Sequence, residues 1–523
     1  ATLIWGSYAF DVTDLPAGPH TIGVRYGGDD TYAVSLAPTL TQTVDKIATT
    51  TTLTRSAATI RAGAGVTLTA TVGSTSGSPD GGSVVFRDGT TALATVAVSG
   101  GSAVHATNGL TVGIHRLTAA FQGTSDLTAS TSAPVTVTVD ARAGAQFRAN
   151  TRTTGSQQYP AVAALSGGGW VVTWASKDQD GSSWGVYAQR YAANGSKAGG
   201  EFRVNTGTAD SQSFPAIAAT ADGGFVVAWL GTTSTGKSTG IRAQRFSAAG
   251  ARLGTEFRVD TTAGTNQTAP SIAAAPGGGF LITWISNNAS GTTFDVHAQL
   301  YDKTAKRVGG EVKANAVTMP AITSASSVAA RSDGSWVVTW TSVAEVGAKS
   351  VVKAQRLTTT GARSGGEIVV TGATWAQSEP VVAGLDRDGF VVVWVSQGQD
   401  GSGKGLYAQR YTSAGVKLGT TFRVTLATAG DQSEPSVVNR LRTGFLVTWT
   451  SPDGSGKGIY CRLYGSNGVP FDAVIPVNTT TANDQKQSAV TMLGSAAFVV
   501  VWTSASDGGA EGVYGQRFEF ADQ

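Results

Sequence analysis

Two aspartates beside a glycine are the clearest candidate for metal chemistry in this sequence. The run Asp178-Gln179-Asp180-Gly181-Ser182 places carboxylates at alternate positions, which is how calcium loops wrap a hard cation with oxygen ligands. The same residue types also favour an ordinary tight turn. We therefore expect no obligatory cofactor, and we name Asp178 and Asp180 as the ligands if calcium binds.

Residues suited to acid–base or nucleophilic catalysis are few and scattered. The four histidines have no metal-binding spacing, and the single cysteine, Cys461, stands where other copies of a repeat have alanine, which suggests a small core residue. The sequence contains no nucleophile elbow or phosphate loop in a strand-to-helix setting. Paired carboxylates distant in the chain are left open. On this basis we predict no catalytic residues and a protein that is not an enzyme.

A Gln-Arg pair recurs at one place in a repeated unit. The copies are Gln189-Arg190, Gln244-Arg245, Gln355-Arg356, Gln409-Arg410 and Gln516-Arg517. A ring of such pairs could bind sugars or carboxylates through several planar hydrogen bonds. Because each pair lies among apolar residues of a predicted strand, we favour the alternative that it ties neighbouring units together.

These residues are carried by a unit that is repeated seven times. Each copy contains an apolar run preceded by glycine and ending in tryptophan, as in Phe225-Val226-Val227-Ala228-Trp229. The seven tryptophans, 53 to 56 residues apart, are Trp174, Trp229, Trp284, Trp340, Trp394, Trp449 and Trp502. So regular a period indicates one supersecondary unit used repeatedly. We expect these tryptophans to form the structural core of the repeats.

Each unit is predicted to contain four strands. In the second copy a proline turn at Gln212-Ser213-Phe214-Pro215 precedes a strand at 216–219, and further strands end at Trp229, Phe246 and Val259. Four strands in a unit of about 54 residues match one blade of a β-propeller. The fold class we predict is all-β, with Ig-like β-sandwiches followed by a seven-bladed β-propeller.

The ends of the repeat region predict how the ring closes. An extra fourth-strand motif, Gln146-Phe147-Arg148-Ala149-Asn150, precedes the first unit, whereas the last unit ends after its third strand. Residues 146–150 are therefore predicted to complete the seventh blade, so that neither end of the ring leaves an unpaired sheet edge. The propeller is predicted to span residues 141–523.

Composition excludes several other functions. The formal net charge is +3, with 38 basic and 35 acidic residues and no long run of either kind. We therefore expect no nucleic-acid partner. The sequence has no apolar run of eighteen residues, so we also expect no membrane insertion.

Two related segments precede the propeller. Residues Gly18, His20, Ile22, Val24 and Tyr26 recur 95 positions later as Gly113, His115, Leu117, Ala119 and Phe121. This pattern resembles the bacterial Ig-like repeat domains of large surface proteins, which implies a β-sandwich in which these residues are structural. We predict a complete Ig-like domain at 47–140 and the C-terminal half of a truncated one at 1–46. The chain is then expected to be a fragment of a longer polypeptide.

The propeller motifs resemble repeats of very long secreted bacterial proteins, including calcium-dependent adhesins of the RTX type. The residues concerned are Asp431-Gln432-Ser433-Glu434-Pro435, Gln399-Asp400-Gly401-Ser402-Gly403 and Leu406-Tyr407-Ala408-Gln409-Arg410-Tyr411. The resemblance implies an extracellular or cell-surface setting. We predict a structural or adhesion protein of the bacterial surface or matrix, whose Ig-like stalk presents the propeller for association with other proteins or with itself.

The alternative is a glycan-binding propeller, a lectin assisted by calcium. Aromatic residues outside the predicted core would then contact sugars, and the candidates are Trp184, Trp375, Tyr159 and Phe214. They do not repeat in register. This weakens a lectin with seven equivalent sites but leaves a single site open.

Overall fold

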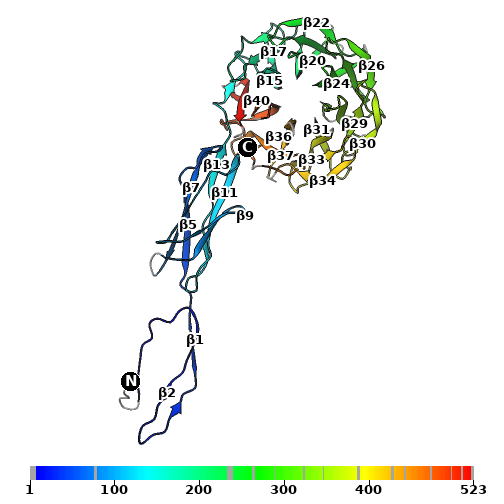
Figure 1. The fold of residues 1–523 in the computed structure, drawn as a ribbon. Coiled ribbons are helices and arrows are strands. Elements are labelled where there is room, and N and C mark those ends of the chain that lie inside the picture. The colour runs from blue at the N-terminus through cyan, green and yellow to red at the C-terminus, as the bar shows by residue number, and fades with distance from the viewer. Residues whose placement is uncertain are drawn as a thin grey trace. The chain divides into compact units, whose positions relative to one another are not determined.

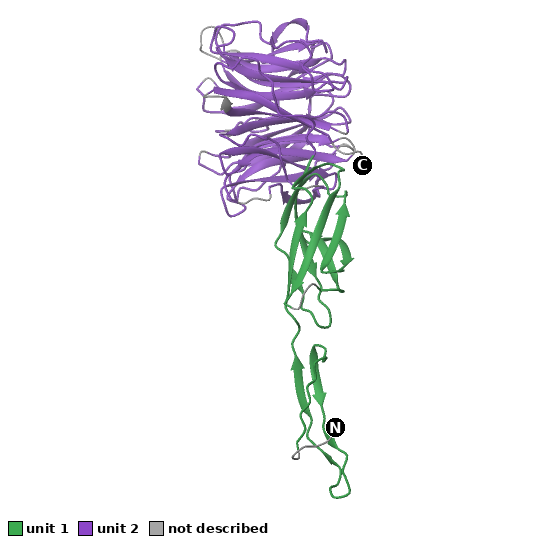
Figure 2. Cartoon of the chain, turned by 90° about the vertical axis from the view of Figure 1, so that its left-hand side faces the viewer, with its two compact units in different colours: residues 1–140 green, residues 141–523 purple. Residues whose placement is uncertain are grey.

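The computed structural model divides the chain into two compact units, Ala1–Asp140 and Ala141–Gln523, which Figure 2 shows in different colours. It describes residues 7–75, 79–232, 239–261, 265–288, 290–321, 324–345, 347–385, 389–425, 429–440, 443–471, 474–495, 497–507 and 510–519. All regular elements in these ranges are strands. In the same ranges there is no helix with the length and apolar character needed to cross a membrane.

The second unit contains seven antiparallel sheets of four strands each, arranged as a ring (Figure 1). The first strands are β15 (Gln157–Ala164), β19 (Gln212–Ala219), β23 (Asn266–Ala274), β27 (Ser327–Ala330), β31 (Gln377–Gly384), β35 (Ser433–Arg440) and β39 (Gln485–Met492). The second strands are β16 (Trp170–Lys177), β20 (Phe225–Thr232), β24 (Phe280–Asn287), β28 (Trp336–Ser342), β32 (Phe390–Gln397), β36 (Gly444–Pro452) and β40 (Ala497–Asp507).

The outer half of each sheet is formed by the third and fourth strands. The third strands are β17 (Trp184–Tyr191), β21 (Thr239–Phe246), β25 (Phe294–Tyr301), β29 (Val351–Leu357), β33 (Lys404–Tyr411), β37 (Lys457–Gly465) and β41 (Ala510–Glu519). The fourth strands are β18 (Phe202–Arg203), β22 (Arg252–Arg258), β26 (Arg307–Lys313), β30 (Arg363–Val369), β34 (Lys417–Arg423), β38 (Ile475–Pro476) and, for the seventh sheet, β14 (Phe147–Arg148). First strands of successive sheets contact one another around the whole ring. This is the architecture of a seven-bladed propeller.

The second strands are buried because each blade is packed on both faces. In β20 the residues from Phe225 to Trp229 are all fully buried, which explains why this run is apolar throughout and does not alternate. In six of the seven sheets an aromatic residue near the start of the second strand stacks on one near the end of the third, as Phe225 does on Phe246 with ring centroids 5.0 Å apart. In the fourth sheet Trp336 faces Leu357 instead. Such cross-strand pairs stabilise the sheet beyond the area they bury.

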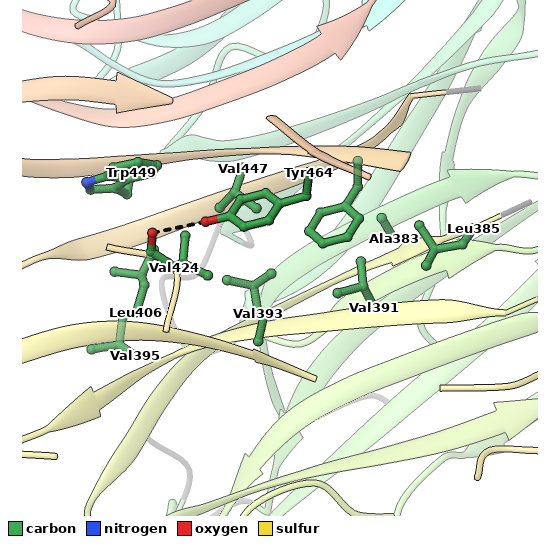
Figure 3. Close-up of a cluster of buried hydrophobic side chains, with 12 residues drawn as sticks. Ala383, Leu385, Val391, Val393, Val395, Leu406, Val424, Val447, Trp449 and Tyr464 are labelled. Atoms are coloured by element: carbon green, nitrogen blue, oxygen red, sulfur yellow. Dashed lines mark hydrogen bonds between the residues drawn. The ribbon is translucent and has the colours of Figure 1, made fainter. Parts of the chain in front are cut away.

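The core lies between blades, as the cluster in Figure 3 illustrates. Val391 and Val393 of the fifth blade pack with Val447 and Trp449 of the sixth. The hydroxyl of Tyr464 in the sixth blade donates a hydrogen bond to the carbonyl of Val424 in the fifth at 3.0 Å. Burial raises the pKa of Tyr464 to about 12. Its hydroxyl is therefore a neutral donor that links the two blades.

The ring closes by pairing the start of the unit with its end. Phe147 of β14 lies opposite Gly515 of β41, and a further bridge joins Arg142 to Phe518. The Asn150 side chain accepts a hydrogen bond from the Val513 N–H at 2.8 Å. One blade is thus built from both ends of the unit, which removes the sheet edge that an open ring would expose.

The first strand of a blade begins earlier than the sequence indicated. In the second copy β19 starts at Gln212, and the predicted turn is a bulge inside it, with a register shift between Ser213 and Ala216. The strand continues through the bulge because Phe214 takes a left-handed conformation with φ of 51°. Non-glycine residues rarely adopt this strained conformation. The sequence therefore suggested a turn before the strand, and the predicted start of the strand was wrong.

Residues 47–140 form a sandwich of two sheets. One has the order β10-β7-β5, from Ser102–Thr107, Val66–Ser74 and Thr49–Arg55. The other has the order β6-β13-β11-β8-β9, with β12 (Ser130–Thr131) also paired to β11. Its strands are β6 (Thr59–Arg61), β13 (Val135–Asp140), β11 (Gly113–Phe121), β8 (Ser83–Asp88) and β9 (Thr91–Ala97). Alternate residues of β7, such as Val66, Leu68 and Ala70, are buried, as expected for strands with one face on a core.

Residues 7–46 form two short antiparallel pairs. Strand β1 (Gly18–Ile22) pairs with β4 (Leu40–Val44), and β2 (Arg25–Tyr26) pairs with β3 (Ser35–Leu36). Val24 is 54% exposed, whereas Ala119 at the corresponding position of the second copy is fully buried. The described part of the first copy therefore has the strand pairing of an Ig-like half without the buried core of the complete domain.

Candidate functional site

The seven repeated tryptophans are part of the core. All seven are between 0 and 3% exposed, and they lie in the hydrophobic clusters between blades, as Trp449 does in Figure 3. Their rings therefore contribute packing, and Trp394 also forms part of the wall of a pocket.

The Gln-Arg pairs hold the ring together in two ways. The buried Gln189 side chain donates to the carbonyls of Arg190 and Gly199, both at 2.9 Å, and so joins the third strand of its own blade to the following segment. Arg190 reaches the next blade and donates to the carbonyl of Ala248 at 2.9 Å. Arg410 does the same to Ser466 at 2.5 Å. Arg190, Arg356 and Arg410 link blades as expected, whereas Arg245 contacts Asp222 of its own blade. The glutamine acts within a blade.

A second link between blades was missed by the sequence reasoning. Glu201 accepts hydrogen bonds from the N–H and hydroxyl of Thr151 at 2.7 and 2.8 Å. Equivalent pairs 50 residues apart are Thr206 with Glu256 and Thr261 with Glu311, and Thr479 with Gln146 closes the ring. The constant 50-residue spacing of Thr and Glu was the available signal.

The two predicted calcium ligands are in different environments. Asp178 is exposed and has a left-handed backbone with φ of 57°. Asp180 is half-buried; its Oδ1 accepts from the Ser182 N–H at 3.3 Å and its Oδ2 from the Asn205 amide at 3.2 Å. Within the ranges that the structure describes, no three or more His, Cys, Asp or Glu residues are grouped so that they could hold a metal ion. Asp180 therefore already has a role in stabilising the turn.

Left-handed residues are gathered on the first strands, which contact one another around the ring. Six of the ten non-glycine residues with left-handed φ in the described chain lie on these strands, with φ of 51–57°: Tyr159, Phe214, Ala269, Glu379, Glu434 and Gln487. They are linked in series, because the Glu434 N–H donates to Glu379 at 2.6 Å, the Gln487 N–H to Glu434 at 2.8 Å and the Tyr159 N–H to Gln487 at 3.1 Å. Strained residues of this kind often accompany functional sites. The series is one candidate site, and its side chains offer carboxylates, an amide and aromatic rings.

Charged groups surround this series. The ammonium of Lys404 lies 3.8 Å from the Glu379 carboxylate, and that of Lys486 lies 2.7 Å from Glu511. The hydrogen bond to Glu511 raises the pKa of Lys486 above its ordinary value, so Lys486 stays charged. The site can thus bind polar ligands through groups of both signs.

Two of the four candidate aromatic residues of the lectin hypothesis come together. The rings of Tyr159 and Phe214 lie 4.2 Å apart between centroids, and Phe214 is 40% exposed. Trp184 lies opposite Lys177 at an end of the first blade. Trp375 is 39% exposed and lines a separate pocket between the fourth and fifth blades. Only the fold could show which of these residues are neighbours.

Histidine and cysteine residues have structural environments. His115 contacts Asp88 at 2.6 Å and the Thr111 carbonyl at 2.7 Å inside the sandwich of residues 47–140. His297 lies 2.6 Å from Glu311, a residue of the Thr–Glu links. Cys461 is fully buried. These side chains therefore support packing and blade-to-blade contacts.

Comparison with known proteins identifies one part of the chain by sequence. Residues 53–140 match the family model described as bacterial Ig-like domain (group 3). A domain of this kind is common in bacterial surface proteins. A search of curated protein sequences finds no match.

Solved structures similar to this chain have low sequence identity. A Dyadobacter fermentans protein of unknown function has 10% identity and a TM-score of 0.44, with 72% of this chain and 98% of that one covered. The β-propeller domain of the Trilobed protease from Pyrococcus furiosus has 9% identity and a TM-score of 0.43, covering 71% and 97%. An acylaminoacyl peptidase from Pyrococcus horikoshii has 8% identity and a TM-score of 0.42, covering 72% and 54%. Likenesses this distant assign no activity to the chain.

They do correct one prediction. The sequence-based prediction that the protein is not an enzyme was wrong as an exclusion, because a protease domain and a peptidase are among the matching structures. Enzymatic function is possible for this fold. The chain is therefore an all-β protein that contains a bacterial Ig-like domain within residues 53–140 and a propeller-like fold after it.

Proposed function

We propose that this protein is an extracellular structural or adhesion protein of the bacterial surface or matrix. The observation that carries the proposal is the presence in one chain of a bacterial Ig-like domain and a complete seven-bladed ring. Ig-like domains serve as spacers in this proposal, and the propeller is the binding module.

The propeller suits binding because its framework is rigid and its loops vary. Thr–Glu hydrogen bonds and Arg–carbonyl hydrogen bonds join successive blades, whereas the connecting loops differ in sequence from blade to blade. Loops on a rigid scaffold are where binding surfaces usually lie. The partners we propose are other surface or matrix proteins, or a second copy of the chain. Calcium, if it takes part, would bind at Asp178 and Asp180.

A cell-binding experiment with the whole chain tests this proposal. Fluorescently labelled protein is added to intact bacteria, untreated or treated with protease, and sedimentation velocity measures self-association in parallel. We expect either saturable binding that protease treatment abolishes, or concentration-dependent dimers and larger species. Monomers at all concentrations together with the absence of saturable binding would contradict an adhesion role.

A further inference from the structure

A pocket of about 300 Å³ lies between the fourth and fifth blades. It is bounded by the segment that follows β30, by the loop leading into β31 and by residues of β32 and β34. Its size is at the lower end of the range for small-molecule sites. It differs from the equivalent positions of neighbouring blades in three respects.

The first difference is a missing carboxylate. In the second blade Glu256 of β22 accepts from the N–H and hydroxyl of Thr206 at 2.8 and 2.7 Å. The sequence Thr421-Phe422-Arg423-Val424 aligns with Glu256-Phe257-Arg258-Val259, and Gly372 aligns with Thr206. Both Thr421 and Gly372 line the pocket. In other blades a glutamate at this position accepts a hydrogen bond from the backbone N–H that corresponds to Gly372. Thr421 has no carboxylate to do so.

The second difference is an exposed aromatic ring beside positive charge. Trp375 is 39% exposed and lines the pocket. The ammonium of Lys349 lies 5.9 Å from its ring centroid and donates to the Thr374 carbonyl at 2.6 Å. Lys417 also lines the pocket, and none of the described lining residues is Asp or Glu. The surroundings therefore favour an anionic ligand with a face that can stack on an indole.

The third difference is a buried hydrogen-bond acceptor without a donor. Gln212 Oε1 accepts from Asn205 at 3.1 Å, and the equivalent Gln432 Oε1 accepts from the Thr425 hydroxyl at 3.3 Å. The residue at this position before the fifth blade is Thr371, whose hydroxyl oxygen accepts from the Val352 N–H at 2.9 Å. Gln377 is 2% exposed, and its Nε2 donates to the Trp375 carbonyl at 3.0 Å. Its Oε1 has no partner in the described chain. Buried acceptors are normally satisfied, so this oxygen is available to a hydroxyl in the pocket.

We propose that the pocket binds a uronic-acid residue of an acidic polysaccharide. The sugar carboxylate takes the place of the glutamate that Thr421 replaces and accepts from the Gly372 N–H. A sugar hydroxyl donates to Gln377 Oε1, and the ring stacks on Trp375. This goes beyond the proposed role in protein association, since the pocket can bind an acidic sugar whether or not the propeller faces bind proteins.

An acidic peptide is a weaker candidate for the same pocket. A peptide carboxylate could accept from Gly372, but an aspartate or glutamate side chain carries no hydroxyl for Gln377 and no ring face for Trp375. A uronic acid has all three features on one small ring.

The test is calorimetric titration of the whole chain with trigalacturonate and with its neutral methyl ester. We expect binding of the acid form and affinity for the ester that is lower by about tenfold or more. In T421E the new carboxylate should occupy the pocket as Glu256 does in its own blade. This variant should bind at least about tenfold more weakly, with an unchanged or raised Tm.

Matched variants make the result specific. W375A should lose binding, and it replaces an exposed side chain, so folding should be retained. F471A removes an exposed aromatic residue outside the pocket and should bind like the unaltered chain. Three results would overturn the proposal: no binding of trigalacturonate at about 10 mM, equal affinity for the ester, or unchanged binding by W375A. Stronger binding of an acetylated glutamate peptide than of trigalacturonate would also overturn it, in favour of a peptide site.

Discussion

Glu256 accepts two hydrogen bonds from a single residue of the preceding blade, the N–H of Thr206 at 2.8 Å and its hydroxyl at 2.7 Å. The Glu256 side chain is 9% exposed, and its other oxygen lies 3.1 Å from Arg242. The carboxylate thus connects two blades from a position largely shielded from water. The equivalent glutamates of the first, third and fourth blades, Glu201, Glu311 and Glu367, likewise accept from the preceding segment. This relationship explains why glutamate occupies this position in the first four blades.

The variant E256A tests the strength of this link. Removal of the Glu256 carboxylate leaves the Thr206 N–H and hydroxyl without their acceptor. We therefore expect the free energy of unfolding to fall by about 1–3 kcal/mol. Denaturant unfolding measures it. The control is E345A, at an exposed glutamate, which should change stability little. Equal effects of the two variants would show that the link contributes nothing specific.

The pH dependence of stability should include a contribution from Glu311. Burial would raise the pKa of this carboxyl, but hydrogen bonds from His297 and Thr261 outweigh burial and lower it from its ordinary value of 4.5. A lowered folded-state pKa stabilises the protein above the unfolded value and ceases to do so as pH falls through the folded value. The stability difference between the unaltered chain and E311Q should therefore shrink as pH falls below 4.5.

Glutamine is a suitable replacement because Gln146 makes the same contacts with Thr479. Denaturant unfolding at a series of pH values provides the measurement. A difference between the unaltered chain and E311Q that does not change as the solution is acidified would contradict the assignment.

Closure of the ring can be tested with a matched pair of asparagines. Asn150 accepts from the Val513 N–H and donates to Gln157, both at 2.8 Å, just as Asn205 accepts from Val186 and donates to Gln212 within a continuous stretch of chain. Because both are buried, N150A and N205A should each cost about 1–3 kcal/mol. Thermal and denaturant unfolding check this. A silent N150A beside a destabilising N205A would show that the ring does not depend on β14.

The role of Asp180 can be separated from calcium binding. The contacts of Asp180 with Ser182 and Asn205 need no metal, so D180A should lower stability by about 1 kcal/mol in chelator. The loss should be the same when calcium is added. D178N should have little effect, since Asp178 is exposed and asparagine tolerates its left-handed backbone. A Tm of the unaltered chain that rises with calcium, and that does not rise in D180A, would instead identify Asp180 as a ligand.

Several features of the fold could be predicted because they follow from local composition. The run ending at Trp229 is apolar at every position, and such a strand must be covered on both faces. Its recurrence at a nearly constant period indicates a ring or array of equal units. Neither inference requires knowledge of which residues meet across blades.

The candidate sites could not be predicted in the same way. Tyr159 and Phe214 are 55 positions apart, and only the packing of neighbouring first strands brings their rings to 4.2 Å. The bulge at Phe214 was interpreted as a turn before the strand, because proline follows it and the left-handed φ of 51° leaves no mark in the sequence. Long-range contacts and backbone conformation decided both points.

The sequence by itself determined that this protein is all-β, built from one repeated four-stranded unit and preceded by Ig-like segments, since strand patterning and period are local properties. Only the tertiary structure shows which polar groups have hydrogen-bond partners. Thr421 is unremarkable in sequence, yet it places no carboxylate beside Gly372, and Gln377 Oε1 has no hydrogen-bond partner in the described chain. The reason is physical: a hydrogen bond between blades depends on two residues about 50 positions apart, and the absence of one matters only where the fold has placed the other.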